Sequence, residues 1–402
     1  MAAPSPRLAE DPFSNRNNTM RNRAGQVMSR LLAVCLGVLL CAPVQAAQQR
    51  TPLAAGQFHS LTLHSDGTLW ATGHNTAGKL GDGTTTDRST PVQVQGLNGM
   101  VSVAAGKDHS LAVRADGTVW GWGHGGYGQL GDGTGNSRMA PVQVPGLNRV
   151  TTVASTNYHS VALRSDGTVW AWGWNYFGQV GDGTYALKYS PVQVPGLTRM
   201  VAVSAGGAHS LALRSDGTVW AWGANYHGQL GDGTTTNRAT PVKVPGLSRI
   251  VAVVAGGGHS LALSSDGTLW AWGYNGFGQL GDGTQGAANN RSTPQQVPGL
   301  VDVSYVAAGY DHSLVALADG TLWAWGNGGH GQLGDGTLND RSTPVQVQGM
   351  SDVTYVAGGQ YHSLATFWDG SFWGWGGAGY GQLGDGTVDY WRPSPVQMLG
   401  SY

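Results

Sequence analysis

Short runs of alternating apolar and polar residues recur along the chain, and glycine-rich turns separate them. Residues 201–205 (VAVSA), 210–213 (SLAL) and 219–222 (VWAW) form three such runs. The segment 215–218 (SDGT) lies between the second and third runs, and an Asp-Gly pair in this setting predicts a hairpin because both turn residues must tolerate positive φ. A fourth run, 241–244 (PVKV), follows a glycine-rich stretch. The period of two, with no helical periodicity, predicts four short β-strands.

This four-strand pattern occurs seven times. The pair His-Ser marks each copy and begins at His59, His109, His159, His209, His259, His312 and His362. The motif Gly-Asp-Gly-Thr recurs in step, beginning at Gly81, Gly131, Gly181, Gly231, Gly281, Gly334 and Gly384. The spacing is constant except for three extra residues in the loop 285–290. Repeats of this kind stack radially, so the sequence predicts an all-β fold: a seven-bladed β-propeller of four-stranded blades.

The turn motifs predict which loops share a face of the propeller. If Pro-Gly-Leu turns each Pro-Val strand back into the next strand, the Pro-Gly-Leu and Ser-Asp-Gly-Thr turns lie on one face. The AGxxHS and WGxNxxG loops then lie on the other face, together with the long crossing to the next blade. The last Pro-Val strand, 395–398, lacks a following partner and the first copy, 51–56, lacks a preceding one. We therefore expect these terminal strands to pair, close the ring and protect its edges.

The N-terminal region has the pattern of a secretory signal peptide. Arg21, Arg23 and Arg30 precede the apolar run 31–44, and small residues around Ala46 form a cleavage pattern. This predicts an N-terminal extension and signal peptide over 1–46, a propeller over 47–402, and a secreted or periplasmic bacterial protein. The run is too short for a membrane-spanning helix, so no stable membrane insertion is expected.

Removal of residues 1–46 changes the chemistry available to the protein. Both cysteines, Cys35 and Cys41, lie in that segment, which excludes disulfides and cysteine metal sites from the mature chain. Five arginines and the acids Glu10 and Asp11 are also lost, leaving 17 basic and 21 acidic residues, a net charge of −4. A mildly acidic chain without clustered basic residues argues against a nucleic-acid partner.

The repeated polar residues indicate structural rather than catalytic roles. A His-Ser pair in every blade predicts a partly buried imidazole that bonds backbone and joins adjacent blades, because an active site needs asymmetry. The aspartates of the DGT turns and GDGT motifs are typical of tight turns, and a single acid per motif does not make a calcium loop. We therefore expect no catalytic residue, no metal site and no cofactor. A basic residue after each GDGT motif predicts a bond between blades; it is Arg88, Arg138, Lys188, Arg238, Arg291, Arg341 or Arg392. The paired tryptophans of WxWG, such as Trp220, are expected to fill the core.

The segment 215–234 (SDGTVWAWGANYHGQLGDGT) resembles the repeat of the regulator of chromosome condensation family, and all seven copies share the resemblance. The resemblance implies a seven-bladed propeller. Secreted bacterial members that inhibit β-lactamases are closest in character, whereas the nuclear member exchanges nucleotide on a small GTPase. No member offers a motif whose functional residues carry over to this sequence, and one fold hosts unrelated functions.

Functional residues are expected where the copies differ, and these positions are rich in aromatic side chains. They lie just before the His-Ser pairs or within the WGxNxxG segments. The predicted partner-binding residues are Phe58, Tyr127, Tyr158, Trp174, Tyr176, Phe177, Tyr226, His227, Tyr274, Phe277, Tyr310, His330, Tyr361 and Tyr380. Trp174, Phe177, Tyr226 and Phe277 are expected to form one contiguous patch. Aromatic side chains with few charges are typical of a recognition surface, although such rings also pack between neighbouring blades.

The sequence therefore favours an exported, non-enzymatic, monomeric protein that binds a protein partner, for which a cell-envelope enzyme is one candidate. A carbohydrate-binding propeller is the alternative, since exposed rings also stack on sugars. A guanine-nucleotide exchange factor for a small GTPase is a third hypothesis, and it is disfavoured because it requires a cytoplasmic location.

Overall fold

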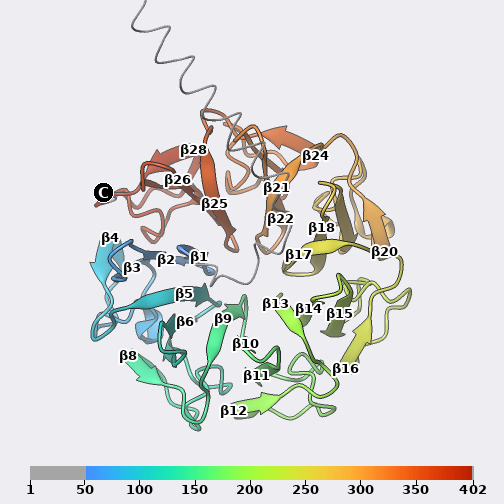
Figure 1. Ribbon diagram of the computed structural model, residues 1–402. Helices are drawn as coiled ribbons and strands as arrows, with labels where there is room; N and C mark the ends of the chain where they lie inside the picture. The colour runs from blue at the N-terminus through green and yellow to red at the C-terminus, as the bar shows by residue number, and fades with distance from the viewer. Residues whose placement is uncertain (1–50, 401–402) are drawn as a thin grey trace, which may run out of the picture. The chain divides into compact units, whose positions relative to one another are not determined.

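The computed structural model describes residues 51–400, which form seven four-stranded antiparallel sheets (Figure 1). The seven-bladed β-propeller expected from the sequence is thus confirmed. The predicted N-terminal extension and signal peptide over 1–46 lie outside the described residues. Among residues 51–400, no helix is long and apolar enough to cross a membrane.

The blades follow one another along the chain. The first contains β1 (Leu53–Ala55), β2 (His59–Leu63), β3 (Leu69–Gly73) and β4 (Arg88–Gln93). The second contains β5 (Met100–Ala105), β6 (His109–Arg114), β7 (Val119–Gly123) and β8 (Arg138–Gln143). The third contains β9 (Val150–Ser155), β10 (His159–Arg164), β11 (Val169–Gly173) and β12 (Lys188–Gln193). The fourth contains β13 (Met200–Ala205), β14 (His209–Arg214), β15 (Val219–Gly223) and β16 (Arg238–Lys243).

The remaining three blades repeat this order. The fifth contains β17 (Ile250–Ala255), β18 (His259–Ser264), β19 (Leu269–Gly273) and β20 (Arg291–Gln296). The sixth contains β21 (Val303–Ala308), β22 (His312–Leu317), β23 (Leu322–Gly326) and β24 (Arg341–Gln346). The seventh contains β25 (Val353–Gly358), β26 (His362–Phe367), β27 (Phe372–Gly377) and β28 (Trp391–Gln397). Two short 3₁₀ turns, η1 (Thr76–Gly78) and η2 (Ala287–Asn289), lie in loops of the first and fifth blades.

Antiparallel pairing in chain order decides which loops share a face. The AGxxHS loop joins the first and second strands of a blade, and the WGxNxxG loop joins the third and fourth, so both lie on one face, which we call the loop face. The SDGT turns and the Pro-Gly-Leu segments lie on the opposite face, the turn face. The N–H of Val150 donates to the carbonyl oxygen of Gly117 there, at 3.1 Å. This assignment of loops to faces agrees with the prediction.

The crossing between blades differs from the prediction. The long glycine-rich segment joins the third and fourth strands of one sheet, and the chain passes to the next blade through the Pro-Gly-Leu segment on the turn face. The residue before each of the next six inner strands has a φ between 54° and 64°; it is Gly99, Arg149, Arg199, Arg249, Asp302 or Asp352. A left-handed residue thus stands at the point where the chain, having passed from the rim to the centre, enters the next sheet.

The predicted pairing of the terminal strands is wrong. β1 pairs with β2 and β28 pairs with β27, in separate sheets. The reason is geometric: the first strand of each blade lies toward the centre and the fourth at the rim, so β1 and β28 occupy opposite edges of their sheets (Figure 1). The ring closes by packing instead, since Leu53 of β1 joins Leu364, Phe372 and Met398 of the seventh blade in one apolar cluster.

A closed ring of hydrogen bonds joins all seven blades. Each His-Ser imidazole is fully buried, and its Nε2 lies 2.8–3.1 Å from the serine hydroxyl of the next blade. The bond between His362 and Ser60 joins the last blade to the first at 2.8 Å. The histidines therefore staple blades as predicted, but they are completely rather than partly buried, and their partners are hydroxyls rather than backbone groups.

The serine in each bond fixes the protonation of the histidine. Ser160 donates its hydroxyl hydrogen to the carbonyl oxygen of Gln129 at 2.8 Å, and the Nε1–H of Trp172 donates to the same oxygen at 2.8 Å. Because the single hydroxyl hydrogen is used there, Nε2 of His109 must donate to Ser160. Nδ1 of His109, like that of the other six ring histidines, has no hydrogen-bond partner. Each junction therefore contains a neutral imidazole, a hydroxyl and a carbonyl, and in six of the seven an indole N–H donates to the same carbonyl.

The apolar core lies between blades. Trp222 is fully buried and packs with Val161, Val169 and Val180 of the preceding blade. Gly181 makes this contact feasible, because a Cβ there would stand 2.6 Å from Nε1 of Trp222 and the residue has a φ of +80°. Trp220 corrects the prediction: it is only partly buried, and the guanidinium of Arg214 lies 5.5 Å from its ring. The two residues lie two positions apart along β15, so alternation directs both rings to the same face of the sheet, where Trp220 packs against the cluster that contains Trp222.

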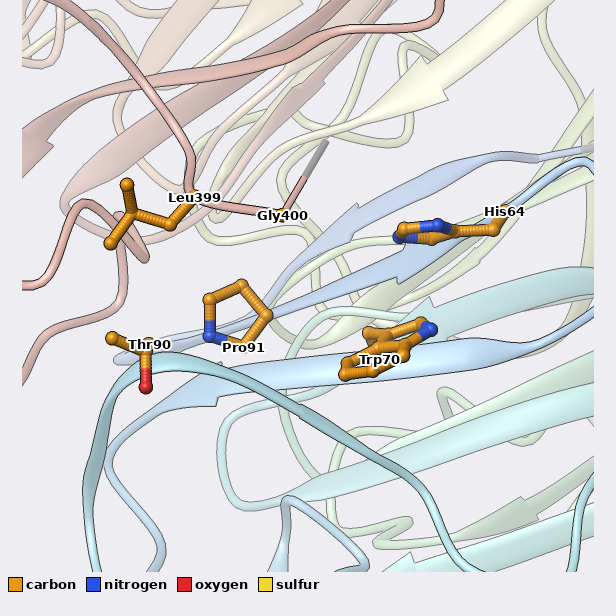
Figure 2. Close-up of a pocket in the computed structure, with 6 residues that line it drawn as sticks. All are labelled: His64, Trp70, Thr90, Pro91, Leu399 and Gly400. Atoms are coloured by element: carbon orange, nitrogen blue, oxygen red, sulfur yellow. The ribbon is translucent and has the colours of Figure 1, made fainter. Parts of the chain in front are cut away.

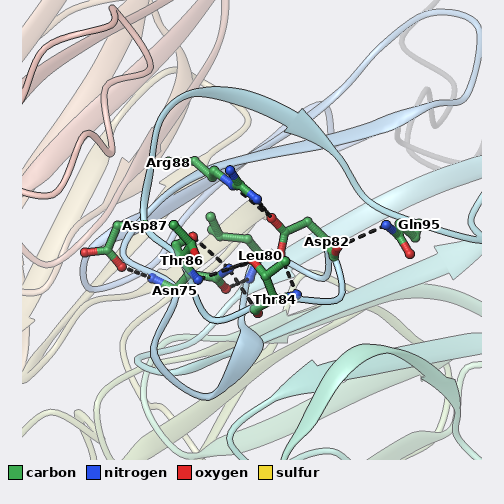
Figure 3. Close-up of polar contacts among 8 residues, drawn as sticks. All are labelled: Asn75, Leu80, Asp82, Thr84, Thr86, Asp87, Arg88 and Gln95. Carbon is green, nitrogen blue, oxygen red and sulfur yellow. Dashed lines mark hydrogen bonds and ion pairs between the residues drawn. The ribbon is translucent and has the colours of Figure 1, made fainter.

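The basic residue after each GDGT motif also corrects the prediction, because it pairs within its own blade. Asp82 accepts hydrogen bonds from Arg88 at 2.8 and 2.9 Å, while its other oxygen accepts from the N–H and hydroxyl of Thr84 and from the amide of Asn75 (Figure 3). All seven blades contain the equivalent ion pair. The loop folds back so that the start of the fourth strand meets the aspartate, which leaves the basic side chain no reach to the next blade.

The buried histidines predict loss of stability at mildly acidic pH. Burial lowers the pKa from 6.5 to about 3 for His109, His209, His259, His312 and His362, and to about 4 for His159. The unfolded chain binds protons below pH 6.5 while the folded ring does not, so the free energy of unfolding should fall from pH 7 to pH 5. Urea unfolding at pH 7.0, 6.0 and 5.0 measures this. A constant free energy over that range would contradict the neutral ring, since only Asp311, whose pKa is raised to about 6, opposes the trend.

The two tryptophans of β15 should differ in their contribution to stability. Trp222→Ala removes a fully buried ring and a hydrogen bond, and should lower the free energy of unfolding by about 3–5 kcal/mol. Trp220→Ala removes a partly buried ring and should cost only about 1–2 kcal/mol. Denaturant unfolding of the two single variants makes the comparison, and equal losses would show that the partly buried ring carries as much packing energy as the fully buried one.

Candidate functional site

The loop face carries all fourteen of the predicted partner-binding residues, because both loop types that contain them lie on it. Tyr176, Tyr226 and Tyr380 are exposed, and the other eleven side chains are partly buried. Ring contacts divide most of the set into three groups. The rings therefore both pack between blades and present surface to solvent.

The first group spans the second, third and fourth blades, and we call it the aromatic arc. Ring centroids lie 4.9 Å apart for Tyr127 and Tyr158, 6.3 Å for Tyr158 and Trp174, and 5.2 Å for Trp174 and Phe177. Phe177 then meets Tyr226 edge-on at 5.6 Å, and Tyr176 contacts Trp174 at 5.8 Å. Tyr176 and Tyr226 are each 59% exposed, so the outer end of the arc is open to a partner.

The second group links the fourth and fifth blades. His227 lies 4.7 Å from Tyr274, and Tyr274 lies 6.2 Å from Phe277. The structure therefore brings Trp174, Phe177 and Tyr226 together as predicted, whereas Phe277 belongs to this neighbouring group and touches none of the three rings.

The third group joins the sixth, seventh and first blades. His330 lies 4.6 Å from Tyr361, Tyr361 stacks on Phe58 at 5.2 Å, and Phe58 lies 4.9 Å from Tyr380. Tyr310 has no ring partner among the described residues. Its backbone accepts from Gly257 at 2.7 Å and donates to Gly359 at 3.0 Å, which fixes it between the fifth and seventh blades.

One residue type holds the aromatic loops to the hydrogen-bonded ring. The side-chain oxygen of Gln179 accepts the N–H of Phe177 at 3.0 Å, while its backbone oxygen accepts from Ser210 and Trp222. The same arrangement supports Tyr127, His227, Phe277, His330 and Tyr380. The recognition loops are thus fastened directly to the rigid junctions.

The first blade departs from this arrangement because Lys79 replaces the glutamine. Lys79 is fully buried, and its Nζ lies 2.6 Å from Asp108 and 3.1 Å from Nδ1 of His74. Burial lowers the pKa of Lys79, and the ion pair with Asp108 opposes that shift. The hydroxyl of Tyr158 lies 3.4 Å from the other oxygen of Asp108, so this ion pair underlies the start of the aromatic arc.

Sequence reasoning did not include several exposed aromatic residues among the partner-binding residues. Tyr390, in the loop before β28, is 80% exposed, Trp391, which begins β28, is 44% exposed, and Tyr185, in the loop before β12, is 53% exposed. Trp368, in a turn of the seventh blade, is 83% exposed. The sequence does mark Trp368 and Trp391, because they are tryptophans outside the WxWG pattern. The repeat pattern does not predict where on the propeller they lie.

A shallow pocket lies at the seam between the first and last blades. It is lined by His64, Trp70, Thr90, Pro91, Leu399 and Gly400 (Figure 2). None of these residues is a predicted partner-binding residue. No group of three metal-ligating side chains converges anywhere within residues 51–400.

Comparison with solved structures gives several similar propellers. Prp20p from Saccharomyces cerevisiae is 25% identical, with a TM-score of 0.75, over 85% of this chain and 88% of that protein. Yeast RCC1 (Prp20) bound to Kap60 is 23% identical, with a TM-score of 0.74, over 89% and 86%. Human WBSCR16 is 26% identical, with a TM-score of 0.70, over 79% and 86%. The comparison with curated protein sequences gave no match.

Family models cover most of the propeller. Two models of the regulator of chromosome condensation (RCC1) repeat match residues 66–113 and 116–163, and residues 100–129 and 150–179. A model of the RCC1-like domain matches residues 188–401, which is more than half of the chain. Together with the seven four-stranded blades, these matches show that the chain belongs to the regulator of chromosome condensation (RCC1)-like family.

Proposed function

We propose that this chain is an exported binding protein without enzymatic activity, which recognises a protein partner through its loop face. The observation that carries the proposal is the aromatic arc, a continuous run of rings from Tyr127 to Tyr226 with two tyrosines open to solvent. An enzyme of the cell envelope, of the β-lactamase or transpeptidase class, is the partner class to test first.

Rigidity supports a binding role. In six of the seven blades, the aromatic residue of the WGxNxxG loop is bonded to a glutamine whose backbone belongs to an inter-blade junction, so little conformational freedom remains to be lost on association. Exposed tyrosine and tryptophan rings supply large contact area at low entropic cost, and such residues dominate binding hot spots. The repeated polar motifs, His-Ser and Gly-Asp-Gly-Thr, form hydrogen bonds within the propeller instead.

The relatives also bind proteins. The structure of Prp20p was described together with its binding properties to Gsp1p and histones. A protein partner for this chain is consistent with that use of the fold, whereas the fold alone does not identify the partner.

Substitutions in the aromatic arc should separate binding from folding. Trp174→Ala combined with Tyr226→Ala should weaken partner binding at least about tenfold, because hot-spot rings often contribute roughly 2 kcal/mol or more each. The melting temperature should change little, since both residues lie in loops. Trp368→Ala is the control: this exposed ring lies in a turn on the opposite face, and binding should be retained.

The partner is first isolated from the cell envelope with the intact chain as bait, and the affinities of all variants are then measured by calorimetry. Equal binding by the arc variant and the control would contradict the proposal. Binding on a glycan array, with no protein partner, would favour the carbohydrate alternative. Accelerated nucleotide release from a small GTPase would favour the exchange-factor alternative.

Export is tested by the mass of the mature protein. Cleavage after Ala46 should give a first residue at or near Ala47, because the small residues there follow an apolar run. Intact-mass measurement of protein from the periplasm or medium gives the answer directly, and a mature chain that retains residues 31–44 would contradict export by this signal.

A further inference from the structure

Two blades carry an aspartate immediately before the His-Ser pair, and they use it differently. The residues are Asp108 in the second blade and Asp311 in the sixth. The other five blades have Phe58, Tyr158, Ala208, Gly258 and Tyr361 at this position. The repeat therefore provides two copies of one carboxylate site in the same molecule, and their surroundings can be compared directly.

The copy at Asp108 is occupied by an ammonium group. Lys79, from the preceding blade, places Nζ 2.6 Å from the carboxylate, and the lysine side chain is fully buried. Tyr158 contributes its hydroxyl to the same carboxylate at 3.4 Å. This copy shows that the position accepts a lysine ammonium beside a tyrosine.

The copy at Asp311 lacks such a cation. Gln279 stands where Lys79 stands in the first blade, and its amide reaches the carboxylate only at 3.5 Å. None of the ion pairs formed within residues 51–400 involves Asp311. Burial, and then the charge of Asp340, raise the pKa of Asp311 to about 6. A partly buried carboxylate without a counter-ion is costly, and a cation from outside the chain would relieve that cost.

Two tyrosines belong to the surroundings of this carboxylate. Tyr310 precedes Asp311 in the chain, and Tyr274 occupies in the fifth blade the repeat position of His74, whose ring contacts the ammonium of Lys79 in the first. The charge of Asp311 raises the pKa of both tyrosines, after the larger effect of burial. Tyr274 is itself packed between His227 and Phe277. Aromatic faces beside a carboxylate favour an ammonium group through cation–π attraction as well as charge.

We propose that Asp311, Tyr274 and Tyr310 form a subsite for the ammonium group of a lysine side chain on the protein partner. The inference rests on the proposed function for the source of the lysine, and it extends the binding surface beyond the aromatic arc. Lysine is the expected cation rather than arginine, because the occupied copy holds a compact ammonium and not a planar guanidinium.

The test uses a small probe rather than the unidentified partner. Nα-acetyl-lysine amide is titrated into the intact chain at pH 7.5 while backbone amide signals are followed by NMR. The shifts should centre on residues 274–279 and 310–312, and Nα-acetyl-norleucine amide, which has no charge, should cause none. Equal shifts with both probes, or shifts elsewhere, would overturn the proposal.

A matched pair of variants removes one charge each. Asp311→Asn should weaken lysine-amide binding by about fivefold or more, because it converts a charge-assisted hydrogen bond into a neutral one. Asp340→Asn also removes one negative charge, but from a residue outside the subsite, and the affinity for the lysine amide should change by less than about twofold. The side-chain oxygen of Asp340 accepts the N–H of Gly328. Asn237 and Asn290 accept the equivalent backbone N–H in the fourth and fifth blades, so an asparagine at position 340 should preserve the loop structure. Equal losses in both variants would show only a general negative field and would overturn the subsite.

A third variant reproduces the occupied copy. Gln279→Lys places an ammonium where Lys79 lies, and it should abolish lysine-amide binding although Asp311 is intact. Undiminished binding by a folded Gln279→Lys variant would contradict the proposal; the Asp311 and Asp340 pair gives the answer independently if that variant does not fold.

The two proposals fail in different ways. Trp174→Ala with Tyr226→Ala should leave lysine-amide binding unchanged, because those rings lie in the third and fourth blades. If these changes spare the partner but Asp311→Asn abolishes lysine-amide binding, the aromatic arc is wrong and the subsite stands. If no variant alters lysine-amide binding, the subsite is wrong whatever the arc does.

Discussion

The structure depends on a hydrogen bond between an imidazole of one blade and a serine of the next. Seven such bonds form a closed ring, and each is completed by a backbone carbonyl that also accepts an indole N–H in six of the junctions. In the first blade, Thr72 replaces the tryptophan, and its hydroxyl lies 2.8 Å from the carbonyl oxygen of Gly381. Because no strand within residues 51–400 is exchanged between the first and last blades, these polar junctions and the apolar contacts around them hold the ring closed.

The hydrogen bond between blades requires a neutral imidazole. The serine hydrogen is committed to the carbonyl, so the imidazole must donate through Nε2 and leave Nδ1 bare in an apolar setting. A protonated ring would bury a charge with no counter-ion, which is why burial holds the pKa of these histidines so far below the usual range. The same residues therefore stabilise the propeller at neutral pH and weaken it in acid.

The positions that vary between blades rest directly on this constant framework. A glutamine bonds the aromatic loop with its side chain and the junction with its backbone, so the loops differ in composition while their anchorage is shared. Exceptions to the repeat are informative for that reason. Lys79 replaces one glutamine and neutralises Asp108, whereas Gln279 keeps its place and leaves Asp311 without a cation. Asymmetry of this kind gives a symmetric ring one particular binding surface.

The sequence by itself determined the blade number, the four strands of each blade and the two sets of loops that share a face, because periodicity and turn chemistry are local properties. It also placed the aromatic side chains of Trp174, Phe177 and Tyr226 together on the loop face. Only the tertiary structure decided how the ring closes, since the Pro-Gly-Leu segment could form a hairpin or a crossing, and the strand after it joins the next sheet. The partners of Arg88 and the placement of Trp220 and Phe277 were likewise decided in three dimensions, because a repeat period says that a contact recurs but not whether it forms within a blade or between blades.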